Sequence, residues 1–486
     1  MMTRVVRISL LFMLVMCAGV LQAQDSIRHD PAEYLSGTLP VLWVNTVDNM
    51  PIVSKDEYIQ GYYWLDAEGF DQYESVGSPD DPLPLQIKGR GNASWTYIKK
   101  PYRLKLDKKA SLLGMNKSKH WVLMASYYDW RCHARDYIYL KVAAMMQMPW
   151  TPGIVPCEVV INGDYMGMYC LCEKIRIEKD RINIVEQPDL CTDPDSITGG
   201  WLLEIDNYRE PNQVYLTDIN NTTIRITHHT PEVLSVEQKS YLLDLLNKTN
   251  DAVNTSDKSS TEWEKYIDIE ALARFYVIQE VLDDQESFSG SCWFYKDYGD
   301  TTKFIFGPVW DSGSTLGGRL NQGDSYGPHF IYETLLPYCH NHWIEEICKF
   351  PRFQIALRKY WHYYRDVVFP QMEQLLQDYR ALTEQALRHD YMRWNDPSAI
   401  YMDEYLPKTQ YAITIKYNFL KEHWDSDYIY PLGDVNLDGK CDITDVNMIV
   451  NHILGKADYD HADVNGDGVI DITDVNAAIN HILGKD

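Results

Sequence analysis

The chain has 486 residues, which at roughly 150 residues per domain suggests about three structural units and excludes a peptide or a single small module. Its 70 Asp and Glu residues outnumber its 45 Lys and Arg residues, and the net charge of −25 disfavours DNA or RNA as a partner. Hydrophobic residues make up 45% and aromatic residues 13% of the chain, which excludes a disordered protein.

The N-terminus has the parts of a secretory signal peptide. Arg4 and Arg7 precede an apolar run over residues 8–21, and Ala23 stands before a polar stretch. This run is shorter than the roughly 20 residues that cross a membrane, and no later stretch reaches that length. We therefore expect residues 1–23 to be removed and the mature protein to be secreted, without a transmembrane segment. Lipid attachment at Cys17 is the alternative, which the bulky residue before it disfavours.

Nine cysteines remain after such a cleavage, from Cys132 to Cys441. An odd number cannot pair completely. The nine are scattered and contain no CxxC pair, so they indicate neither a disulfide-rich scaffold nor a zinc site. Their pairing stays open.

Strand-prone and helix-prone segments occupy different parts of residues 39–425. Short β-prone runs separated by Gly, Asn, Asp and Pro come first, with one helical pattern over 135–148 among them. Helical periodicity then prevails from 235 to 424. The pattern predicts an α+β core followed by helices. The predicted strands are 39–44, 83–88, 102–106, 120–125, 158–161, 165–173 and 201–205; the predicted helices are 237–246, 269–282 and 353–388, with a loop over 254–261.

A glycine turn over residues 88–95 joins two of these strands and is rich in basic residues. Arg103 and Lys105 alternate with apolar residues, so both share the polar face of the second strand. A glycine turn can bring backbone N–H groups to a phosphate, although an ordinary hairpin with a solvated basic edge has the same pattern. Because the domain is acidic, a bound nucleotide would need a local cationic cluster, for which Arg90, Lys100, Arg103 and Lys105 are the candidates.

Two acidic residues flank a later strand-like run. Asp284 follows the predicted helix 269–282, and Asp311 follows a Gly-Pro bend. Phosphoryl transfer uses one carboxylate to orient the attacking hydroxyl and others to hold Mg²⁺. The order parallels the catalytic Asp, metal-binding Asn and Asp-Phe-Gly of protein kinases, with Asp284, Ser291 and Asp311 in those places. Alternatively, Asp284 ends a helix and Asp311 makes structural hydrogen bonds.

Together these segments resemble the CotH kinase family, named for spore coat protein H, whose secreted or coat-associated members have an atypical kinase fold. The motifs of the resemblance lie in residues 90–95, 99–106, 112–123, 162–167, 199–206 and 307–311. They extend over most of the predicted core. The resemblance implies an atypical protein-kinase-like core with a helical C-terminal part.

The resemblance also implies roles for individual residues. The region of Lys100 and Lys105 would meet the nucleotide phosphates, Asp284 would serve as the catalytic or metal-binding acid, and Asp311 would bind Mg²⁺. Glu173 and Glu204 are further candidates for the nucleotide pocket. The chain departs from the family pattern at Ser291, where many members have Asn, and at the Ser and Gly after Asp311. An exported kinase must also find ATP outside the cytoplasm.

The last 56 residues are a separate acidic unit, with 11 Asp and 3 Lys over residues 431–486. A 12-residue pattern that starts at residue 434 recurs at residue 463, and 17 of 23 aligned positions are identical. Oxygen side chains at positions 1, 3, 5, 9 and 12, with Gly at 6, are what a Ca²⁺ ion with six to eight oxygen ligands requires. Position 7 contributes only its carbonyl. The predicted ligands are Asp434, Asn436, Asp438, Lys440, Asp442 and Asp445 in the first loop, and Asp463, Asn465, Asp467, Val469, Asp471 and Asp474 in the second.

Each loop runs into an amphipathic helix that Gly455 or Gly484 ends, and no helix precedes the first loop. Two such loop-helix units resemble a type I dockerin, the small all-α module that binds a cohesin on a scaffold or cell-surface protein. In dockerins the residues 443–444 and 472–473 face the cohesin. The alternative is a calcium-stabilised tail with no partner. We predict a dockerin over 433–486 and a linker over 426–432.

Two functions from different classes follow from the sequence. The first is a secreted kinase that transfers the γ-phosphoryl group of ATP to Ser or Thr of a partner protein and reaches its site through the dockerin. The second is an inactive kinase-like subunit with a structural or adhesive role in a dockerin-assembled complex. A third idea, carbohydrate binding, rests only on the 14 Trp and 35 Tyr residues, which more often reflect core packing.

Overall fold

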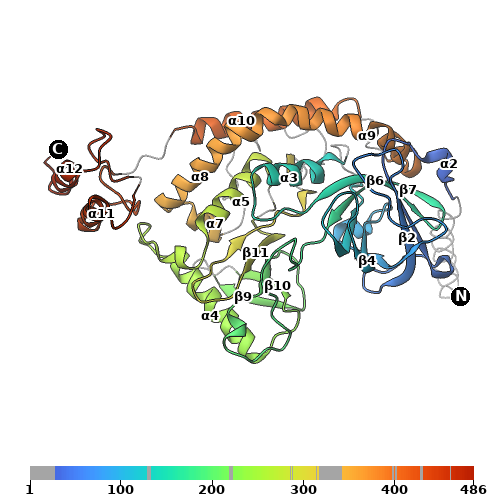
Figure 1. Cartoon of the computed structure of the whole chain (residues 1–486), viewed down its shortest axis with the longest axis horizontal. Coiled ribbons are helices and arrows are strands. Elements are labelled where there is room, and N and C mark those ends of the chain that lie inside the picture. Colours follow the sequence, from blue (N-terminus) through green and yellow to red (C-terminus); the bar gives the residue numbers. More distant parts are fainter. Residues whose placement is uncertain are drawn as a thin grey trace, which may run out of the picture. The chain divides into compact units, whose positions relative to one another are not determined.

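The computed structural model describes residues 28–127, 133–217, 223–284, 286, 288–313, 315–316, 342–396, 399, 402–426, 431–459 and 461–485 (Figure 1). The predicted signal peptide, Cys17, Cys132 and Cys339 lie outside these residues. The chain divides into two compact units. The first consists of the described residues up to His133, Gly153–Lys174 and Asp378–Asp403; the second consists of Ala134–Pro152, Ile175–Gln377 and the described residues from Glu404 onward.

The first unit is a closed β-barrel. Its strands follow the order β1-β2-β3-β4-β5-β7-β6, and β6 closes the barrel by pairing with β1 in parallel while the other pairs are antiparallel. Closure leaves none of these strands with an unpaired edge. The strands are β1 (Val41–Thr46), β2 (Ile59–Asp66), β3 (Leu83–Gly89), β4 (Tyr102–Ala110), β5 (Ser118–Met124), β6 (Ile154–Ile161) and β7 (Asp164–Glu173).

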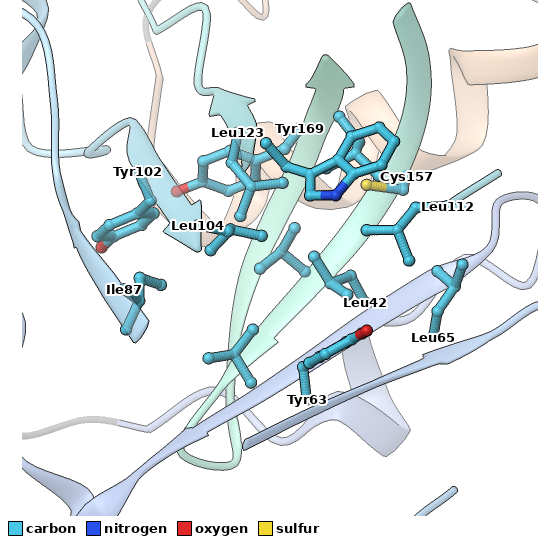
Figure 2. Close-up of a cluster of buried hydrophobic side chains, with 14 of the residues drawn as sticks. Leu42, Tyr63, Leu65, Ile87, Tyr102, Leu104, Leu112, Leu123, Cys157 and Tyr169 are labelled. Carbon is cyan, nitrogen blue, oxygen red and sulfur yellow. The ribbon is translucent and has the colours of Figure 1, made fainter. Parts of the chain in front are cut away.

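Apolar side chains fill the barrel. Leu42 of β1 and Leu104 of β4 are fully buried, whereas the residues next to them in each strand are partly or fully exposed, as expected for strands with one buried face. Figure 2 shows these leucines with Tyr63, Tyr169 and Cys157 in one cluster. Each fully buried leucine contributes about 1.5–3 kcal/mol. The interior is therefore an apolar core.

The end of helix α9 (Met372–Trp394) belongs to the first unit through a buried ion pair. Asp390 accepts hydrogen bonds from Lys99 Nζ at 2.7 Å and from the backbone N–H of Met168 at 2.9 Å, and both charged side chains are fully buried. A Cβ at residue 167 would lie 1.9 Å from the Asp390 carboxylate, so glycine is required there. Burial raises the pKa of Asp390 to about 6, against the opposing effect of the Lys99 ammonium. The pair thus fastens this helix to β7.

The second unit is built on a five-stranded antiparallel sheet with the order β12-β11-β8-β10-β9. Its central strand, β8, is buried at every position. Phe294 of β11 stacks on Phe306 of β12 with ring centroids 5.3 Å apart. The strands are β8 (Trp201–Ile205), β9 (Gln213–Thr217), β10 (Thr223–Thr230), β11 (Cys292–Lys296) and β12 (Ile305–Phe306).

Helices make up the rest of the second unit, and α5 is the most buried of them. Asp268 caps the start of α5 by accepting a hydrogen bond from the N–H of Ala271 at 2.8 Å. The helices of this unit are α3 (Ala134–Met145), α4 (Val236–Val253), α5 (Ile269–Val281), α7 (His342–Ile347), α8 (Pro351–Tyr363), the first residues of α9, and α10 (Tyr405–Trp424).

A buried lysine at the end of β11 links two loops at one corner of the sheet. The ammonium of Lys296, which is 2% exposed, has four acceptors at 2.6–3.2 Å for its three N–H groups: the carbonyls of Thr198, Asp297 and Gly299 and the hydroxyl of Thr302. All of these acceptors are uncharged. They join the residues before β8 to the turn after β11.

Residues 431–485 form two loop-helix units. The helices are α11 (Ile443–Ile453) and α12 (Ile472–Ile482), and their apolar residues form one small core. Gly455 and Gly484 follow the helices with φ values of 64° and 61°, the left-handed conformation that ends a helix with glycine. Ile453 and Leu454, which the helical pattern places on the apolar face, are exposed. The expected all-α module with its glycine stops is confirmed.

The mixed helix and strand architecture agrees with the predicted α+β class. The closed barrel does not clearly match the predicted kinase-like core. The predicted helix 353–388 is instead α8, a π-helical turn over Tyr364–Val368, a short turn at Pro370, and α9, because proline lacks the N–H that an uninterrupted helix needs. Among the described residues no helix is long and apolar enough to span a membrane. No disulfide joins any two of the seven cysteines in the described part of the chain.

Candidate functional site

Asp284 lies just after α5 and is fully buried. Its backbone N–H continues the helix by donating to the carbonyl of Gln279 at 3.0 Å. Its carboxylate accepts a hydrogen bond from the Tyr139 hydroxyl at 3.0 Å. Buried carboxylates that accept a hydrogen bond from a side chain occur both at functional sites and in purely structural networks.

Tyr139 of α3 has two acceptors for one proton. Its hydroxyl lies 2.6 Å from Gln279 Oε1 and 3.0 Å from Asp284 Oδ2, and a hydroxyl donates to only one of them at a time. Burial, together with the negative charges of Asp284 and Asp311, raises the pKa of Tyr139 well above its usual range. The phenol therefore stays protonated and acts as a donor. The influence of Asp311 places that carboxylate in the same neighbourhood.

Asp311 follows β12 and is exposed. Ser291 Oγ, just before β11, donates a long hydrogen bond of 3.5 Å to Asp311 Oδ2. The next residue, Ser312, is buried and donates to Asp136 Oδ1 of α3 at 2.5 Å. These contacts hold the segment after β12 against α3 and the start of β11.

Three residues of this region have left-handed backbones without being glycine. Their φ values are 53° for Asp283, 51° for Ser291 and 64° for Asp311. Such conformations cost about 1–3 kcal/mol each when the surroundings impose them, and they gather at functional sites. Their coincidence with the two predicted acids makes this region the candidate site.

A buried ionic triad supports the segment that carries Asp284. Lys416 of α10 lies 3.0 Å from Glu280 Oε2 and 3.3 Å from Asp283 Oδ1, and all three side chains are buried. Tyr276 donates to the second oxygen of Glu280 at 2.8 Å. Burial lowers the pKa of Lys416, but the two carboxylates outweigh this effect and raise it. Lys416 therefore remains charged and fixes Asp283 beside Asp284.

Glu204, at the end of β8, forms a second polar group in the same unit. Its Oε2 lies 2.7 Å from His229 Nε2, and the His229 ring stacks on Trp293 with centroids 4.2 Å apart. Burial raises the pKa of Glu204 to about 8; the charge of Asp206 adds to this effect and hydrogen bonds from Ser291 oppose it. A hydrogen bond between Glu204 and His229 requires that one of the two facing atoms carries a proton.

The second unit thus brings together three of the predicted acids. Burial raises the pKa of the Cys292 thiol, and the charges of Glu204 and Asp284 raise it further, so Cys292 lies close to both. Ser291 contacts Asp311 and Glu204. We call Glu204, Asp284 and Asp311 the acidic cluster.

The predicted basic residues lie in the first unit. Lys100 Nζ donates to the carbonyl of Trp95 at 2.7 Å and lies 5.2 Å from the centre of its ring. A Cβ at Gly89 would lie 2.3 Å from the Trp95 ring, so the close packing of this tryptophan explains that glycine. The backbone N–H of Arg90 donates to the carbonyl of Pro101 at 3.2 Å.

Arg103 and Lys105 lie on the outer face of β4, because the residues that alternate with them fill the barrel. Both are near Tyr58, 5.9 Å from the centre of its ring. Glu173, at the end of β7, is buried and accepts a hydrogen bond from the N–H of Gly153 at 2.9 Å. The structure therefore places the six nucleotide candidates in two units, with Glu204 alone in the second.

Sequence reasoning missed several residues of the second unit. Tyr139 stands one helical turn after Asp136 in α3, and Asp283 is adjacent to Asp284, so both could have been noticed locally. Lys416 and His229 have no local pattern that relates them to the acidic cluster. Only tertiary packing brings them to their partners.

The two calcium loops have nearly the same internal geometry. Asp445 is buried and accepts the backbone N–H groups of Val435, Asn436 and Asp442 at 2.8–3.0 Å, and Asp474 repeats these contacts in the second loop. Asp434 accepts from the N–H groups of Asp438 and Gly439. Burial raises the pKa of Asp434 to about 6, and the charges of Asp438 and Asp445 add to this effect.

The oxygen donors of these loops fit Ca²⁺, a hard cation that takes carboxylate, amide and carbonyl oxygens. Asp442 and Asp471 also cap α11 and α12 by accepting the N–H of the residue two positions on. Among the described residues no three His, Cys, Asp or Glu side chains are already arranged as a metal site. Backbone N–H groups of the loops donate to several of the carboxylate oxygens.

Comparison with protein families decides the affiliation of the chain. The model of the family described as CotH kinase protein matches residues 87–426, which is more than half of the chain. The chain belongs to the CotH kinase protein family. The model described as Dockerin type I domain matches residues 432–483. Both predicted resemblances are thereby confirmed, and dockerin type I domains bind calcium. No curated protein matches the chain.

Proposed function

We propose that this CotH-family protein transfers the γ-phosphoryl group of Mg²⁺-ATP to Ser or Thr of a partner protein. The single observation that supports this most is the pairing of buried Asp284 with exposed Asp311 in one neighbourhood beside Tyr139. Mg²⁺ is commonly bound through one or two carboxylates together with substrate phosphates, so two acids and a hydroxyl suffice. Asp284, Ser291 and Asp311 are oxygen donors that fit this requirement.

The proposed roles follow from burial and contacts. Exposed Asp311 would hold the metal ion, which would neutralise charge on the phosphates. Buried Asp284 would accept the proton of the attacking hydroxyl, with the Tyr139 O–H able to turn from Gln279 to Asp284. Arg90, Lys100, Arg103 and Lys105 remain the proposed cations for the phosphates, and Glu173 and Glu204 remain proposed nucleotide-binding residues.

We propose that the dockerin module attaches the protein to a cohesin-bearing partner in an extracellular or cell-surface complex. Two Ca²⁺ ions would fold its loops. Ile443 and Ile472 are 67% and 61% exposed, although both are apolar, which suits a surface that a partner covers. The proposed boundaries are a signal peptide over 1–23, a kinase-like domain over 39–425, a linker over 426–432 and a dockerin over 433–486.

The second candidate is an inactive subunit with a structural or adhesive role in the same complex. Trp95 packs on the glycine turn, and Lys100 donates to its carbonyl. Ser291 also offers a neutral hydroxyl ligand that is shorter than an Asn side chain. These features favour a turn that serves packing rather than phosphate binding.

Titration calorimetry with Mg²⁺-ATP and transfer of labelled phosphate test the enzyme proposal on the full chain. We expect Asp311→Ala to abolish transfer and to weaken binding of Mg²⁺-ATP, because it removes the metal ligand. Asp284→Asn should lower turnover more than nucleotide affinity, because an orienting acid acts mainly in the transition state. Asp244→Asn, at an exposed residue of α4 in the same unit, is the matched control. Equal background incorporation in the wild type and all variants would favour the structural role.

A further inference from the structure

The segment from the end of β3 to the start of β5 concentrates positive charge in an acidic protein. Residues 88–119 contain ten Lys and Arg residues and a single acid, Asp107, a net charge of +9 in a chain of −25. Of these ten cations only Lys99 is buried, and it forms an ion pair with Asp390. The other nine are at least partly exposed.

Cations gather around one tyrosine on the outside of the barrel. Lys88 Nζ of β3 lies 4.9 Å from the centre of the Tyr58 ring, and Arg103 and Lys105 of β4 lie 5.9 Å from it. Lys88 pairs with Arg103 in the sheet register. Cation–π contacts at exposed sites stabilise by about 0.5–1 kcal/mol each, which helps hold three like charges together.

The far end of the hairpin adds further cations that lack acidic partners. Lys105 and Lys108 of β4, Lys117, and Lys119 of β5 form no ion pair with any residue in the described part of the chain. By contrast, Lys248 of α4 pairs with Asp244 at 2.7 Å. Like charges repel, so a surface of this kind lowers the stability of the free protein and attracts an anion from outside it.

We infer that this surface binds an extended, acidic segment of a partner polypeptide. Arg103 and Lys105 are successive outward residues of β4, about 6.6–6.8 Å apart, and an extended peptide with carboxylates on alternate residues has the same repeat. Asp107 takes the next outward place, and Lys108, Lys117 and Lys119 add positive charge around the end of the hairpin. Both edges of β4 are already paired within the barrel, so the contact is made by side chains and not by addition of a strand. We call the surface formed by Lys88, Arg103, Lys105, Lys108, Lys117 and Lys119 the basic face.

The inference goes beyond phosphoryl transfer, because Lys108, Lys117 and Lys119 are outside the proposed nucleotide set. The basic face would select which protein the CotH domain contacts, whether that domain is active or structural. A binding experiment can therefore test it without any enzymatic readout.

Fluorescence anisotropy of a labelled peptide of alternating Glu and Ser, titrated with the full chain, tests the proposal. Reversing Lys108→Glu, Lys117→Glu and Lys119→Glu together should weaken binding about tenfold or more, because attraction becomes repulsion. Lys179→Glu, Lys239→Glu and Lys421→Glu change net charge equally at exposed residues elsewhere and should leave the affinity unchanged. Equal losses in both triple variants would overturn the proposal in favour of a net-charge effect. If the reversal variant fails to fold, the corresponding triple Lys→Gln variant replaces it, with a smaller loss expected.

Competitors identify the class of ligand. A peptide of the same composition with its Glu residues in one block should compete less well, and added salt should weaken binding, since screening acts within about 8–10 Å. Displacement by heparin or RNA together with no binding of the acidic peptide would overturn the polypeptide assignment.

Asp311→Ala should bind the peptide like the wild type. Loss of phosphoryl transfer with intact peptide binding would thus separate the two proposals, and absence of peptide binding in the wild type would refute the basic face alone.

Discussion

The calcium loops and the acidic cluster both crowd carboxylates, but over very different distances along the chain. Each loop draws its oxygens from 12 consecutive residues, and backbone N–H groups of the same loop bind them. The network around the acidic cluster draws on residues from Asp136 to Lys416, and Lys416, the cation of its buried triad, stands on another helix. The first arrangement can be read from spacing. The second exists only when the second unit is folded.

This difference predicts which substitutions should have only local effects on the structure. A substitution in a calcium loop removes acceptors for nearby N–H groups and should loosen one small module. A substitution at the base of the acidic cluster removes a charge that several distant elements share, so the whole second unit should respond. Three experiments test this contrast, beginning with the largest expected effect.

Lys416→Met should destabilise the second unit most. It leaves Glu280 and Asp283 buried without their cation, a change that costs about 3–5 kcal/mol in comparable buried pairs. Denaturant unfolding would measure the loss of free energy of unfolding. Lys421→Met, at an exposed residue of the same helix, is the control and should stay within about 0.5 kcal/mol of the wild type. If the two variants lost equal stability, the triad would not be the support that its geometry indicates.

Asp445→Ala combined with Asp474→Ala should loosen the dockerin and leave the rest of the chain intact. Each substitution removes the acceptor of three backbone N–H groups, and leaving a buried group unsatisfied costs about 1–3 kcal/mol. Hydrogen exchange of α11 and α12 should accelerate, as it should when a chelator removes calcium from the wild type.

Asp458→Ala is the matched control for the loops, because its side chain is 94% exposed in the same module. Asp445→Ala alone should weaken binding to a cohesin less than the double change if either repeat can present the binding surface. Exchange in α11 and α12 that ignores both the chelator and the double variant would contradict the calcium assignment.

Glu204→Gln should produce the smallest effect, visible in the pH dependence of stability. The folded-state pKa of about 8 lies above the usual value for a glutamate, so the folded protein holds a proton that the unfolded chain releases. Stability should therefore fall as pH rises toward 8. Between pH 7 and 8 the loss should reach about 1 kcal/mol at most, since one pKa unit corresponds to about 1.4 kcal/mol.

The Gln variant cannot release this proton, so its stability should be flatter over the same interval. The raised pKa values of Asp390 and Asp434, at about 6, affect a lower range and do not confuse the comparison. Parallel slopes for wild type and variant from pH 7 to 8 would show that Glu204 is already ionised in the folded protein.

Alternation within strands could be predicted from the sequence, whereas closure of the barrel could not. The expected strands 83–88, 165–173 and 201–205 agree closely with β3, β7 and β8. β2, β9 and β10 were missed. The parallel pairing of β1 with β6, which closes the barrel, joins residues more than a hundred positions apart and leaves no local pattern.

The site divides in the same way. Asp284 and Asp311 could be proposed because each stands at a break between elements, and the calcium loops because ligand type repeats at fixed spacing. The left-handed backbone of Asp283, and the role of Lys416 beside it, depend on α10 packing against α5 and could not be inferred locally. Whether Arg90, Lys100, Arg103 and Lys105 bind a nucleotide stays a prediction.

The lysine that closes one corner of the second sheet has a consequence for ionic strength. The ammonium of Lys296 is bound directly by carbonyl and hydroxyl oxygens, and the charges of Asp300 and Asp297 only partly offset the lowering of its pKa to about 8 by burial. Dissolved ions therefore have little direct charge pairing to weaken there. Exposed pairs such as Lys248 with Asp244 lose much of their attraction in a saline medium. The geometry of the corner between β8 and β11 should therefore change little between low and high ionic strength.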